Sequence, residues 1–371
     1  MKAKIDSLHQ HNVWDLVELP EGRKPVGSKW VFKVKTNADG STERFKARLV
    51  AQGYTQREGL DYDETFSPMV HSESVRSVIS LACKEGLKLH QMDVTTAFLS
   101  GELDQEIYMK QPKGFTAGGQ EHLVCRLKKS LYGLKQSSQC WNQVLDVQLK
   151  KMGFQQSPSD PCIYISKKDG LFIIAVYVDD ILLAAKSQKK ITQVKHDLAK
   201  RFQLKDMGEL HYFLGVSVKQ DSETGRTWIG QPGYTEAVLK KFGMENCKPA
   251  NTPIASGTKL LKATDDSERV DTKLYQSAVG CLLYLSGWTR PDIAYAVGSV
   301  ARFCSDPTKE HWAAVKRIFR YLQGTTSYGL VYSKDDGDGN LIGFSDADWA
   351  GDPNDRRSTS ERWNSTSSAD H

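Results

Sequence analysis

The sequence predicts an α+β fold, with hairpins in its first two thirds and helices in its last third. Two apolar runs, 171–178 and 181–185, flank a pair of carboxylates and predict a tight β-hairpin with both charges at its tip. Residues 29–35 alternate in polarity up to a turn signal at 37–40, and residues 44–52 return as the second strand of another hairpin. Beyond a polar linker the apolar residues follow a helical spacing instead.

The remaining elements follow from local patterns along the chain. Helical spacing of apolar residues predicts helices at 72–83, 134–152, 191–202, 234–242, 275–285, 291–303 and 307–322. Short apolar or alternating runs predict strands at 87–94, 212–220, 226–231 and 341–349. We expect Ser72 to cap its helix, residues 289–292 to form a capping box, and residues 306–307 to start the last helix in a similar way.

The composition is that of an ordinary globular protein. Hydrophobic residues make up 39% and charged residues 26% of the 371 positions. No apolar run reaches the roughly 18 residues that a membrane-spanning helix needs, and residues 1–12 lack the apolar segment of a secretory signal. The seven cysteines are scattered without C-x-x-C spacing, which argues against a zinc site and a disulfide framework and fits a reducing compartment.

Positive charge is concentrated near the N-terminus, although the net charge of the chain is only +5. Between residues 24 and 57 there are eight basic residues against two acidic ones, interleaved with Trp30, Phe32, Phe45 and Tyr54. A basic segment that carries aromatic side chains suits a nucleic acid. A solvated basic face is the alternative when this segment is considered by itself.

The adjacent acids Asp179 and Asp180 are the strongest chemical signal. Two carboxylates beside a buried strand are costly to desolvate, and a divalent cation compensates them most simply. The alternative is an ordinary polar turn, because Asp is common in turns. Asp93 lies far upstream, near the end of another expected strand. Brought beside the pair, it would complete a site for two Mg²⁺ ions that holds a triphosphate, lowers the pKa of an attacking 3′-hydroxyl and neutralises the leaving pyrophosphate.

These acids belong to an ordered set of short motifs that spans about residues 6–360. The set resembles the reverse transcriptase region of copia-type LTR retrotransposon polyproteins, truncated at its C-terminal end. A single motif is weak evidence, whereas the ordered set is specific. The matching segments are 29–33 (KWVFK), 46–54 (KARLVAQGY), 61–68 (DYDETFSP), 91–94 (QMDV), 97–99 (AFL), 131–136 (LYGLKQ), 177–180 (YVDD), 212–215 (YFLG), 289–295 (TRPDIAY) and 345–350 (SDADWA).

The resemblance implies a right-hand polymerase with fingers, palm and thumb. Residues 1–250 would form the fingers and palm, 251–272 a linker, 273–335 a helical thumb/connection region and 336–371 the fragmentary, truncated start of a ribonuclease H-like domain. Asp346 matches the first catalytic acid of that last domain, but the sequence that follows it departs from the family. We therefore expect no ribonuclease H activity.

The resemblance also assigns the metal site. Asp93, Asp179 and Asp180 match the catalytic carboxylates, which are expected to hold two Mg²⁺ ions, with Mn²⁺ as a substitute. Asp93 and Asp179 would be the firmest ligands, the carbonyl oxygen of Val94 would add another, and Asp180 would be bound less directly.

A second set of residues matches the site of the incoming deoxynucleoside triphosphate: Lys46, Arg48, Val94, Phe98, Tyr132, Gly133 and Gln136. Arg48, assisted by Lys46, matches the fingers arginine on the triphosphate, and its alternative is a surface strand residue. Phe98 matches the bulky residue that excludes a 2′-hydroxyl, and its alternative is a core phenylalanine. Residues 132–136 match the loop that packs on the nascent base pair, where Gly133 permits close approach, and the alternative is a helix-entry turn.

Two further features complete the comparison with the family. Phe213, Leu214 and Gly215 match the hairpin that grips the primer end, and a structural strand is the alternative for the two apolar side chains. Ser138 and Gln139 stand where the family usually has Pro and Arg. We therefore hypothesise that this copy is catalytically weakened although its carboxylates survive.

The predicted function is that of an RNA-directed DNA polymerase. Its expected partners are an RNA or DNA template with its primer and deoxynucleoside triphosphates, with no membrane and no indication of an oligomeric state. The expected compartment is the cytoplasm, within a particle where the element is intact, or the nucleus. One alternative is a decayed, non-catalytic nucleic-acid-binding remnant. Another is a two-metal nuclease or phosphatase, which would leave Phe98 and Arg48 unexplained.

Overall fold

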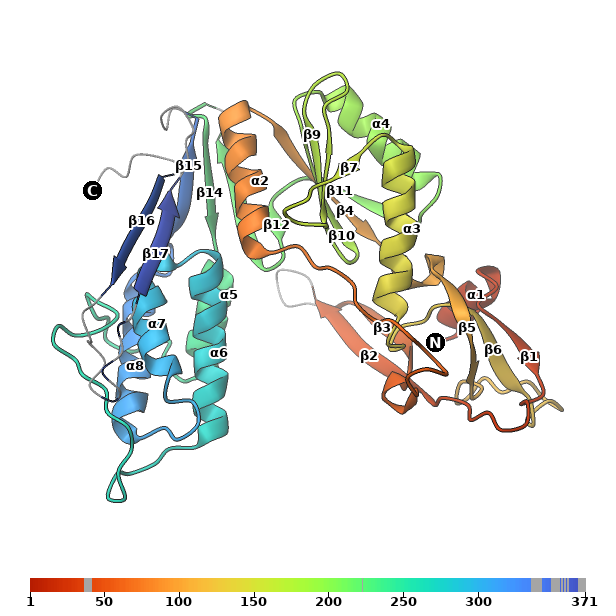
Figure 1. The fold of residues 1–371 in the computed structure, drawn as a ribbon, viewed down its shortest axis with the longest axis horizontal. Helices are drawn as coiled ribbons and strands as arrows, with labels where there is room; N and C mark the ends of the chain where they lie inside the picture. Colours follow the sequence, from red (N-terminus) through yellow and green to blue (C-terminus); the bar gives the residue numbers. More distant parts are fainter. Residues whose placement is uncertain are drawn as a thin grey trace. The chain divides into compact units, whose positions relative to one another are not determined.

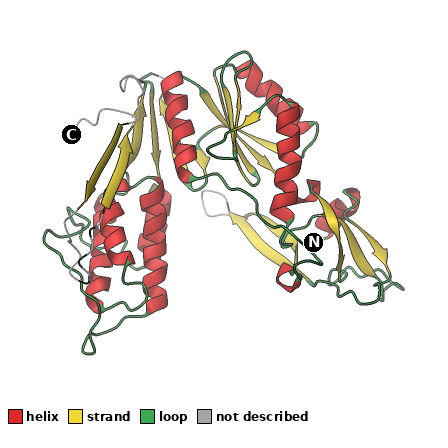
Figure 2. Ribbon diagram, in the orientation of Figure 1, coloured by secondary structure: helices red, strands yellow, loops and turns green. Residues whose placement is uncertain are grey.

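The computed structural model describes residues 1–36, 42–221, 223–334, 342–347 and 360–365, together with the single residues 354, 356 and 358. Helices and sheets are mixed along the chain (Figure 1, Figure 2), which confirms the predicted α+β class. The chain divides into two compact units. Unit 1 consists of residues 1–70 and 90–208, and unit 2 consists of residues 71–89 and 209–371.

A six-stranded sheet forms the centre of unit 1. Its strand order is β11 (Leu204–Glu209), β4 (Lys88–Val94), β10 (Asp180–Ala185), β9 (Phe172–Tyr177), β8 (Ile163–Ser166) and β7 (Gln155–Gln156). Apart from Tyr177 and Asp180 beside the turn, β9 and β10 are apolar and buried on both faces, as their continuous apolar runs require.

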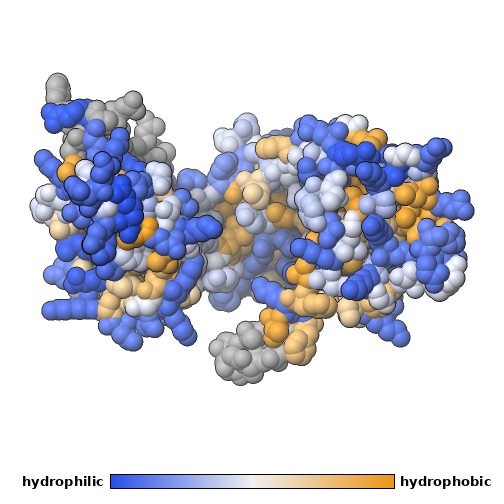
Figure 3. Space-filling model, turned by 90° about the horizontal axis from the view of Figure 1, so that it is seen from below, coloured by the Kyte–Doolittle hydropathy of each residue, from blue (hydrophilic) through white to orange (hydrophobic). Residues whose placement is uncertain are grey.

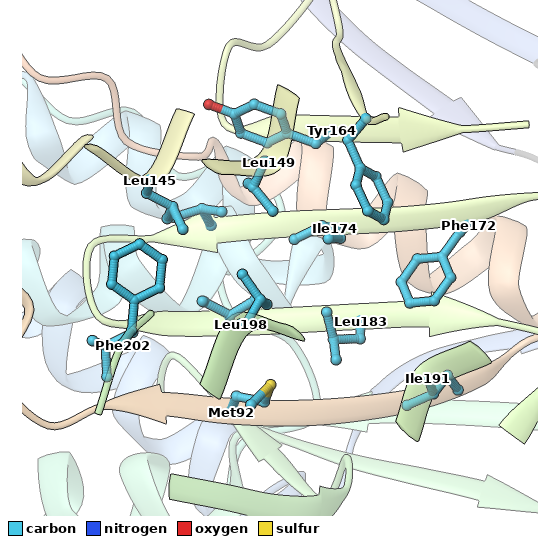
Figure 4. Close-up of a cluster of buried hydrophobic side chains, with 14 of the residues drawn as sticks. Met92, Leu145, Leu149, Tyr164, Phe172, Ile174, Leu183, Ile191, Leu198 and Phe202 are labelled. Atoms are coloured by element: carbon cyan, nitrogen blue, oxygen red, sulfur yellow. The ribbon is translucent and has the colours of Figure 1, made fainter. Parts of the chain in front are cut away.

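Two helices, α3 (Ser137–Lys151) and α4 (Gln188–Ala199), pack on one face of this sheet. Figure 4 shows the cluster in which Leu145 and Leu149 of α3 and Leu198 of α4 meet Ile174 and Leu183 of the central strands. Burial of each such side chain contributes about 1.5–3 kcal/mol. This cluster holds the β9–β10 hairpin firmly up to its turn.

The rest of unit 1 contains a smaller sheet and a long two-stranded ribbon. The sheet has the order β1 (Trp14–Val17), β6 (Val124–Lys129) and β5 (Glu102–Met109), and helix α1 (Lys2–Gln10) shares its core. Two short 3₁₀ turns, η1 (Gly53–Thr55) and η2 (Ala97–Ser100), also belong to this unit.

The ribbon of β2 (Ser28–Thr36) and β3 (Thr42–Ala51) confirms the predicted N-terminal hairpin, whose turn signal lies outside the described residues. Cross-strand pairing places Phe32 with Ala47 and Lys33 with Lys46. One face of the ribbon is therefore apolar and the other is basic. Phe32 and Phe45 are 66% and 82% exposed, and apolar side chains reach the surface along this ribbon (Figure 3).

Unit 2 combines an antiparallel sheet with a helical bundle. The sheet has the order β12 (Tyr212–Phe213), β13 (Val216–Asp221), β14 (Arg226–Gly230) and β15 (Gly329–Ser333), and α2 (Ser72–Glu85) contacts β14 and β15. The bundle contains α5 (Pro232–Lys241), α6 (Thr272–Trp288), η3 (Pro291–Ile293), α7 (Ala294–Ala301) and α8 (Lys309–Gly324), which share one apolar core. Residues 242–271 connect α5 to α6 without a helix or strand, and Leu260 packs into that core.

The last described strands are β16 (Ile342–Ala347) and β17 (Ser360–Ser365), which pair antiparallel. Residues 341, 348 and 349 of the predicted strand 341–349 lie outside the described residues. No helix within the described ranges is long and apolar enough to cross a membrane.

Two predicted caps are wrong in detail. His71 rather than Ser72 precedes the first turn of α2, and the Ser72 hydroxyl donates to Glu73 instead. The capping box expected at 289–292 does not form, because the Thr289 hydroxyl donates to Gln231 over 2.9 Å and the carboxylate of Asp292 pairs with Arg290. In both places a nearby polar side chain competes successfully for the capping group.

Two predicted boundaries are also wrong. The last helix begins after Thr308 rather than at 306–307, because Thr308 and the buried His311 form a capping box. The strand expected at 212–220 is broken into β12 and β13, because Leu214 and Gly215 adopt left-handed conformations and reverse the chain.

Candidate active site

The acid-bearing hairpin of unit 1 contains a strained two-residue turn. Tyr177 and Asp180 are paired across β9 and β10, so Val178 and Asp179 alone form the loop. The prediction that both acids sit at the tip is therefore half right, since Asp180 already belongs to β10. Val178 has a φ of +54°, which is unfavourable for a β-branched residue because its Cβ crowds the backbone.

Helix α3 stabilises this turn through Trp141. The indole Nε1 donates a hydrogen bond of 2.6 Å to the carbonyl oxygen of Val178. Trp141 is 1% exposed, and its ring lies edge-on against Phe202 with centroids 5.0 Å apart. A rigid, buried donor thus holds the carbonyl of the strained residue in place.

A second hydrogen bond joins the turn to the end of β4. The backbone N–H of Val94 donates to the carbonyl oxygen of Asp179 over 2.8 Å. Asp93 is the residue before Val94, so two acid-bearing segments that are far apart in the sequence lie side by side. Gln91, two residues earlier on β4, donates from Nε2 to Asp180 over 3.1 Å.

The three acids influence one another electrostatically. Burial raises the pKa of Asp179, the charge of Asp93 raises it further, and Arg48 and Lys46 oppose this rise. Burial also raises the pKa of Asp180. The hydrogen bond from Gln91 lowers this pKa, whereas the charges of Asp179 and Asp93 raise it further. In the described part of the chain, no three His, Cys, Asp or Glu side chains stand close enough together to hold a metal ion.

Two basic side chains lie near Asp179, and a third lies near those two. Lys46 and Arg48 come from β3, and the guanidinium of Arg48 lies over the ring of Tyr132 at 5.8 Å. Lys4 of α1 is the third, since burial lowers the pKa of its ammonium and the charges of Lys46 and Arg48 lower it further. Partly buried cations that repel one another favour an anionic ligand.

The predicted base-pair loop docks on the end of β3. Ala51 N–H donates to the carbonyl of Tyr132 over 2.7 Å, and Gly53 N–H donates to the carbonyl of Gly133 over 3.1 Å. Gly133 has a φ of +92°, and a Cβ there would lie 2.2 Å from the carbonyl oxygen of Ala51. Only glycine fits this position.

Gln136 is buried beneath the same loop. Its Oε1 accepts from Gln56 over 3.1 Å, and its Nε2 donates to the carbonyl of Asp61 over 2.9 Å. The carboxamide is thus engaged within the chain, which makes Gln136 a support for the loop rather than an open contact.

Phe98 lies beside Tyr132 at the start of this loop. The two rings are edge-to-face with centroids 4.7 Å apart, and Phe98 is half-buried against the core under the six-stranded sheet. Its carbonyl accepts from the hydroxyl of Ser130. The Phe98 side chain is therefore partly packed and partly accessible.

The predicted primer-grip residues belong to unit 2, whereas all the other predicted site residues belong to unit 1. Phe213 ends β12 with its side chain 1% exposed, and Leu214 and Gly215 form the turn into β13. Unit 1 thus contains the three acids and the residues predicted to bind the nucleotide, and unit 2 contains the predicted primer grip.

Sequence reasoning missed three residues of this site. Gln91 stands in a matching motif, but nothing in the motif predicts that its amide reaches Asp180. Trp141 is one of the apolar residues on the predicted 134–152 helix, so its burial was expected while its hydrogen bond to Val178 was not. Lys4 carries no signal in the sequence, because only the packing of α1 against β3 brings it near Arg48.

The family can be assigned from sequence comparison. The model of the family described as reverse transcriptase (RNA-dependent DNA polymerase) matches residues 11–256. The chain therefore belongs to the reverse transcriptase family. Enzymes of this family work with divalent metal ions and act on nucleic-acid templates and deoxynucleotides.

Several transposon proteins are similar to this chain. The retrovirus-related Pol polyprotein from transposon TNT 1-94 of Nicotiana tabacum is 43% identical over 366 residues, which are 97% of this chain and 27% of that protein. The Pol polyprotein from transposon RE1 of Arabidopsis thaliana is 42% identical over 369 residues, 97% of this chain and 24% of that protein. A putative transposon Ty5-1 protein of Saccharomyces cerevisiae is 37% identical over 242 residues, 65% of this chain and 78% of that protein.

These matches confirm the resemblance to copia-type retrotransposon polyproteins. The chain spans about a quarter of the length of the two Pol polyproteins it matches.

Proposed function

We propose that the chain is an RNA-directed DNA polymerase that extends a primer 3′-hydroxyl, with Asp93, Asp179 and Asp180 as its metal-binding carboxylates. The observation that carries this proposal is the 2.8 Å hydrogen bond between Val94 and Asp179, which joins the two acid-bearing segments. Burial raises the pKa values of Asp179 and Asp180, and the repulsion among the three carboxylates adds to this rise, which is consistent with a site that binds a cation.

The donor set fits two Mg²⁺ ions, with Mn²⁺ as a substitute, because it offers carboxylate oxygens and the carbonyl of Val94 but no sulfur or imidazole. When bound, such ions lower the pKa of the attacking 3′-hydroxyl and neutralise charge on the leaving pyrophosphate. Asp93 and Asp179 are the firmer ligands in this proposal. Asp180 is partly engaged by Gln91 and is bound less directly.

The triphosphate is bound by the cations of β3 and α1. Arg48 offers paired donors to phosphate oxygens, and Tyr132 beneath it keeps its guanidinium plane oriented. Lys46 and Lys4 add positive charge near Arg48. Burial lowers the pKa of Lys4 and the charges of Lys46 and Arg48 lower it further; an anionic triphosphate would relieve the repulsion among these cations.

The nascent base pair and the sugar are positioned by the loop that follows Ser130. Gly133 allows the backbone to approach closely, and Gln136 anchors the loop from beneath. The ring of Phe98 is fixed by Tyr132 and faces the sugar, so it rejects a 2′-hydroxyl by steric contact.

The domain boundaries and the cellular compartment are also proposals. Residues 1–250 supply fingers and palm, including the primer grip at 213–215, and residues 273–335 supply the thumb and connection after the 251–272 linker. Residues 336–371 supply a ribonuclease H-like segment without activity of its own, which a labelled RNA–DNA hybrid that stays intact would support. The cytoplasm, a particle within it, or the nucleus is the proposed compartment.

Extension of an oligo-dT primer on poly-rA with Mg²⁺ tests the function. We expect Asp179→Asn to reduce the rate by at least about 10³-fold, because the carboxylate acts only through the metal site. The matched control is Asp266→Asn, since Asp266 is an exposed acid of unit 2. Extension that is insensitive to Asp179→Asn would overturn the proposal, and primer–template binding without extension would select the non-catalytic remnant.

A further inference from the structure

The turn between β12 and β13 has an unfavourable backbone conformation at a non-glycine residue. Phe213 pairs with Val216, so Leu214 and Gly215 alone form the loop. Their φ values are +48° and +81°, which glycine tolerates and leucine does not favour. Because Phe213 is buried in unit 2, the turn is anchored at one end, but its own conformation needs a further constraint.

Tyr284 of α6 supplies that constraint. Its hydroxyl donates a hydrogen bond of 2.7 Å to the carbonyl oxygen of Leu214. A Cβ built on Gly215 would lie 2.3 Å from this hydroxyl oxygen but 3.5 Å from the ring carbon Cζ. The hydroxyl therefore fills the space that glycine leaves open, and it touches both residues of the loop.

The Tyr284 ring is itself held by the helical bundle. The ring of Tyr234 on α5 meets it edge-to-face with centroids 4.9 Å apart, and Trp288 lies one turn further along α6 at 6.5 Å. On either side of Tyr284 in the helix, Leu282 and Leu285 are fully buried in the bundle core. The Tyr284 hydroxyl thus connects α6 to the turn.

We propose that Tyr284 is a positioning residue for primer binding: its hydroxyl sets the backbone of residues 214 and 215, which hold the primer end. This inference rests on the proposed function, because it takes the primer-grip assignment of residues 213–215 from there. Tyr284 acts through the turn and does not touch the reacting atoms.

The first test compares Tyr284→Phe with Tyr295→Phe in the full chain. Tyr284→Phe removes the donor and keeps the ring packing, whereas the Tyr295 hydroxyl is exposed on α7 and has no hydrogen-bond partner within the described ranges. The probe is an RNA template annealed to a DNA primer with 2-aminopurine at its 3′ end. We expect Tyr284→Phe to raise the Kd for this duplex about 3- to 10-fold, as loss of one part-buried hydrogen bond predicts.

Kinetics separate positioning from general damage. Tyr284→Phe should raise the KM for primer–template by a similar factor and leave the KM for the deoxynucleotide within about twofold at saturating duplex. Tyr295→Phe should match the unaltered chain in every readout. A Tyr284→Phe protein that binds and extends the duplex like the unaltered chain would overturn the proposal.

A double-mutant cycle with Gly215→Ala gives a second, independent test. Alone, this change should weaken duplex binding about 10-fold, because the new Cβ collides with the Tyr284 hydroxyl and the positive φ is strained. In the Tyr284→Phe background the collision is absent, so the same change should cost only about two- to threefold. Additive effects would contradict the proposal.

The binding assay distinguishes failure of this inference from failure of the proposed function, since it needs no turnover. A chain that binds the duplex but does not extend it would overturn the polymerase assignment, and the Tyr284 comparison would still be decided by the Kd values. A chain with no affinity for the duplex would overturn both.

Discussion

The two units carry two-residue hairpin turns that are built alike and differ in what they present. In unit 1 the turn is Val178 and Asp179, and in unit 2 it is Leu214 and Gly215. In each, the first loop residue is an apolar residue with positive φ, and its carbonyl accepts from an aromatic side chain on a helix of the same unit. The donors are Trp141 of α3, at 2.6 Å, and Tyr284 of α6, at 2.7 Å.

The difference lies at the second loop position. Asp179 keeps a side chain that can bind a cation, and its backbone carbonyl is tied to Val94. Gly215 has no side chain and leaves the backbone of its turn open to close approach. The same local solution, a strained turn held by a rigid aromatic donor, thus presents a carboxylate in one unit and bare backbone in the other.

The largest effect should follow from removing the donor in unit 1. Trp141→Phe leaves the part-buried carbonyl of Val178 without its partner, which should lower the free energy of unfolding by about 1–3 kcal/mol. Because the turn carries Asp179, the extension rate should fall about 10- to 100-fold as the carboxylate loses its position. Urea unfolding and primer extension measure the two effects.

Trp312→Phe is the control for the loss of indole volume, since Trp312 packs in the core of unit 2. It should lower stability and leave the extension rate per folded molecule within about threefold. A Trp141→Phe protein that is folded and fully active would show that the turn keeps its conformation without the indole, and the likeness between the two turns would then have no functional meaning.

Much of this arrangement could be predicted from the sequence. Apolar runs and helical spacing gave the β9–β10 and β2–β3 hairpins and most of the helices, because burial of one face controls those elements. The matching motifs located the acids. The left-handed turns were missed, since Val178 and Leu214 are not residues that favour positive φ, and their conformations depend on donors far away in the chain. Lys4, Gln91 and Tyr284 act through tertiary contacts that leave no local pattern.

Substitutions at the start of α3 should have a smaller effect. They test whether fixing the helix that carries Trp141 improves the activity of unit 1. Gln139 lines a cavity of about 140 Å³ together with the acids Asp63, Glu64 and Asp104. A guanidinium at this position would face those carboxylates, so Gln139→Arg should form new ion pairs and fix the first turn of the helix that carries Trp141. If this copy is weakened as hypothesised, Ser138→Pro combined with Gln139→Arg should raise the extension rate about 3- to 10-fold.

The control for that repair is Gln143→Arg, because Gln143 lines the same cavity one turn further along α3. It adds the same charge without restoring the family residue and should change the rate by less than about twofold. Equal rates in the repaired and the unaltered chain would contradict the hypothesis of a weakened copy, while the role of Trp141 would be unaffected.

The smallest predicted effect is the pH dependence of stability, which should have opposite directions in the two units. Burial lowers the pKa of His311 in unit 2 below its ordinary value of 6.5, so the unfolded chain binds more protons than the folded one as the pH falls through that range. The neutral ring is required, since its Nδ1 accepts from Thr308 over 3.0 Å and its Nε2 donates to the carbonyl of Leu261 over 2.9 Å. Unit 2 should therefore lose stability between about pH 7 and pH 5.5.

The raised pKa values of Asp179 and Asp180 make unit 1 lose stability as the pH rises above the ordinary range of an Asp carboxyl.

Amide hydrogen exchange in α8, corrected for the intrinsic exchange rate, measures the response of unit 2. His311→Gln is the informative variant, because Gln can complete the same capping box but does not titrate. Its absolute protection should be lower, since the stacking of the imidazole on Phe303 at 3.9 Å is lost, but the decline between pH 7 and pH 5.5 should disappear. If the decline persists in His311→Gln, another group controls it, and the opposite pH responses of the two units would not arise from His311.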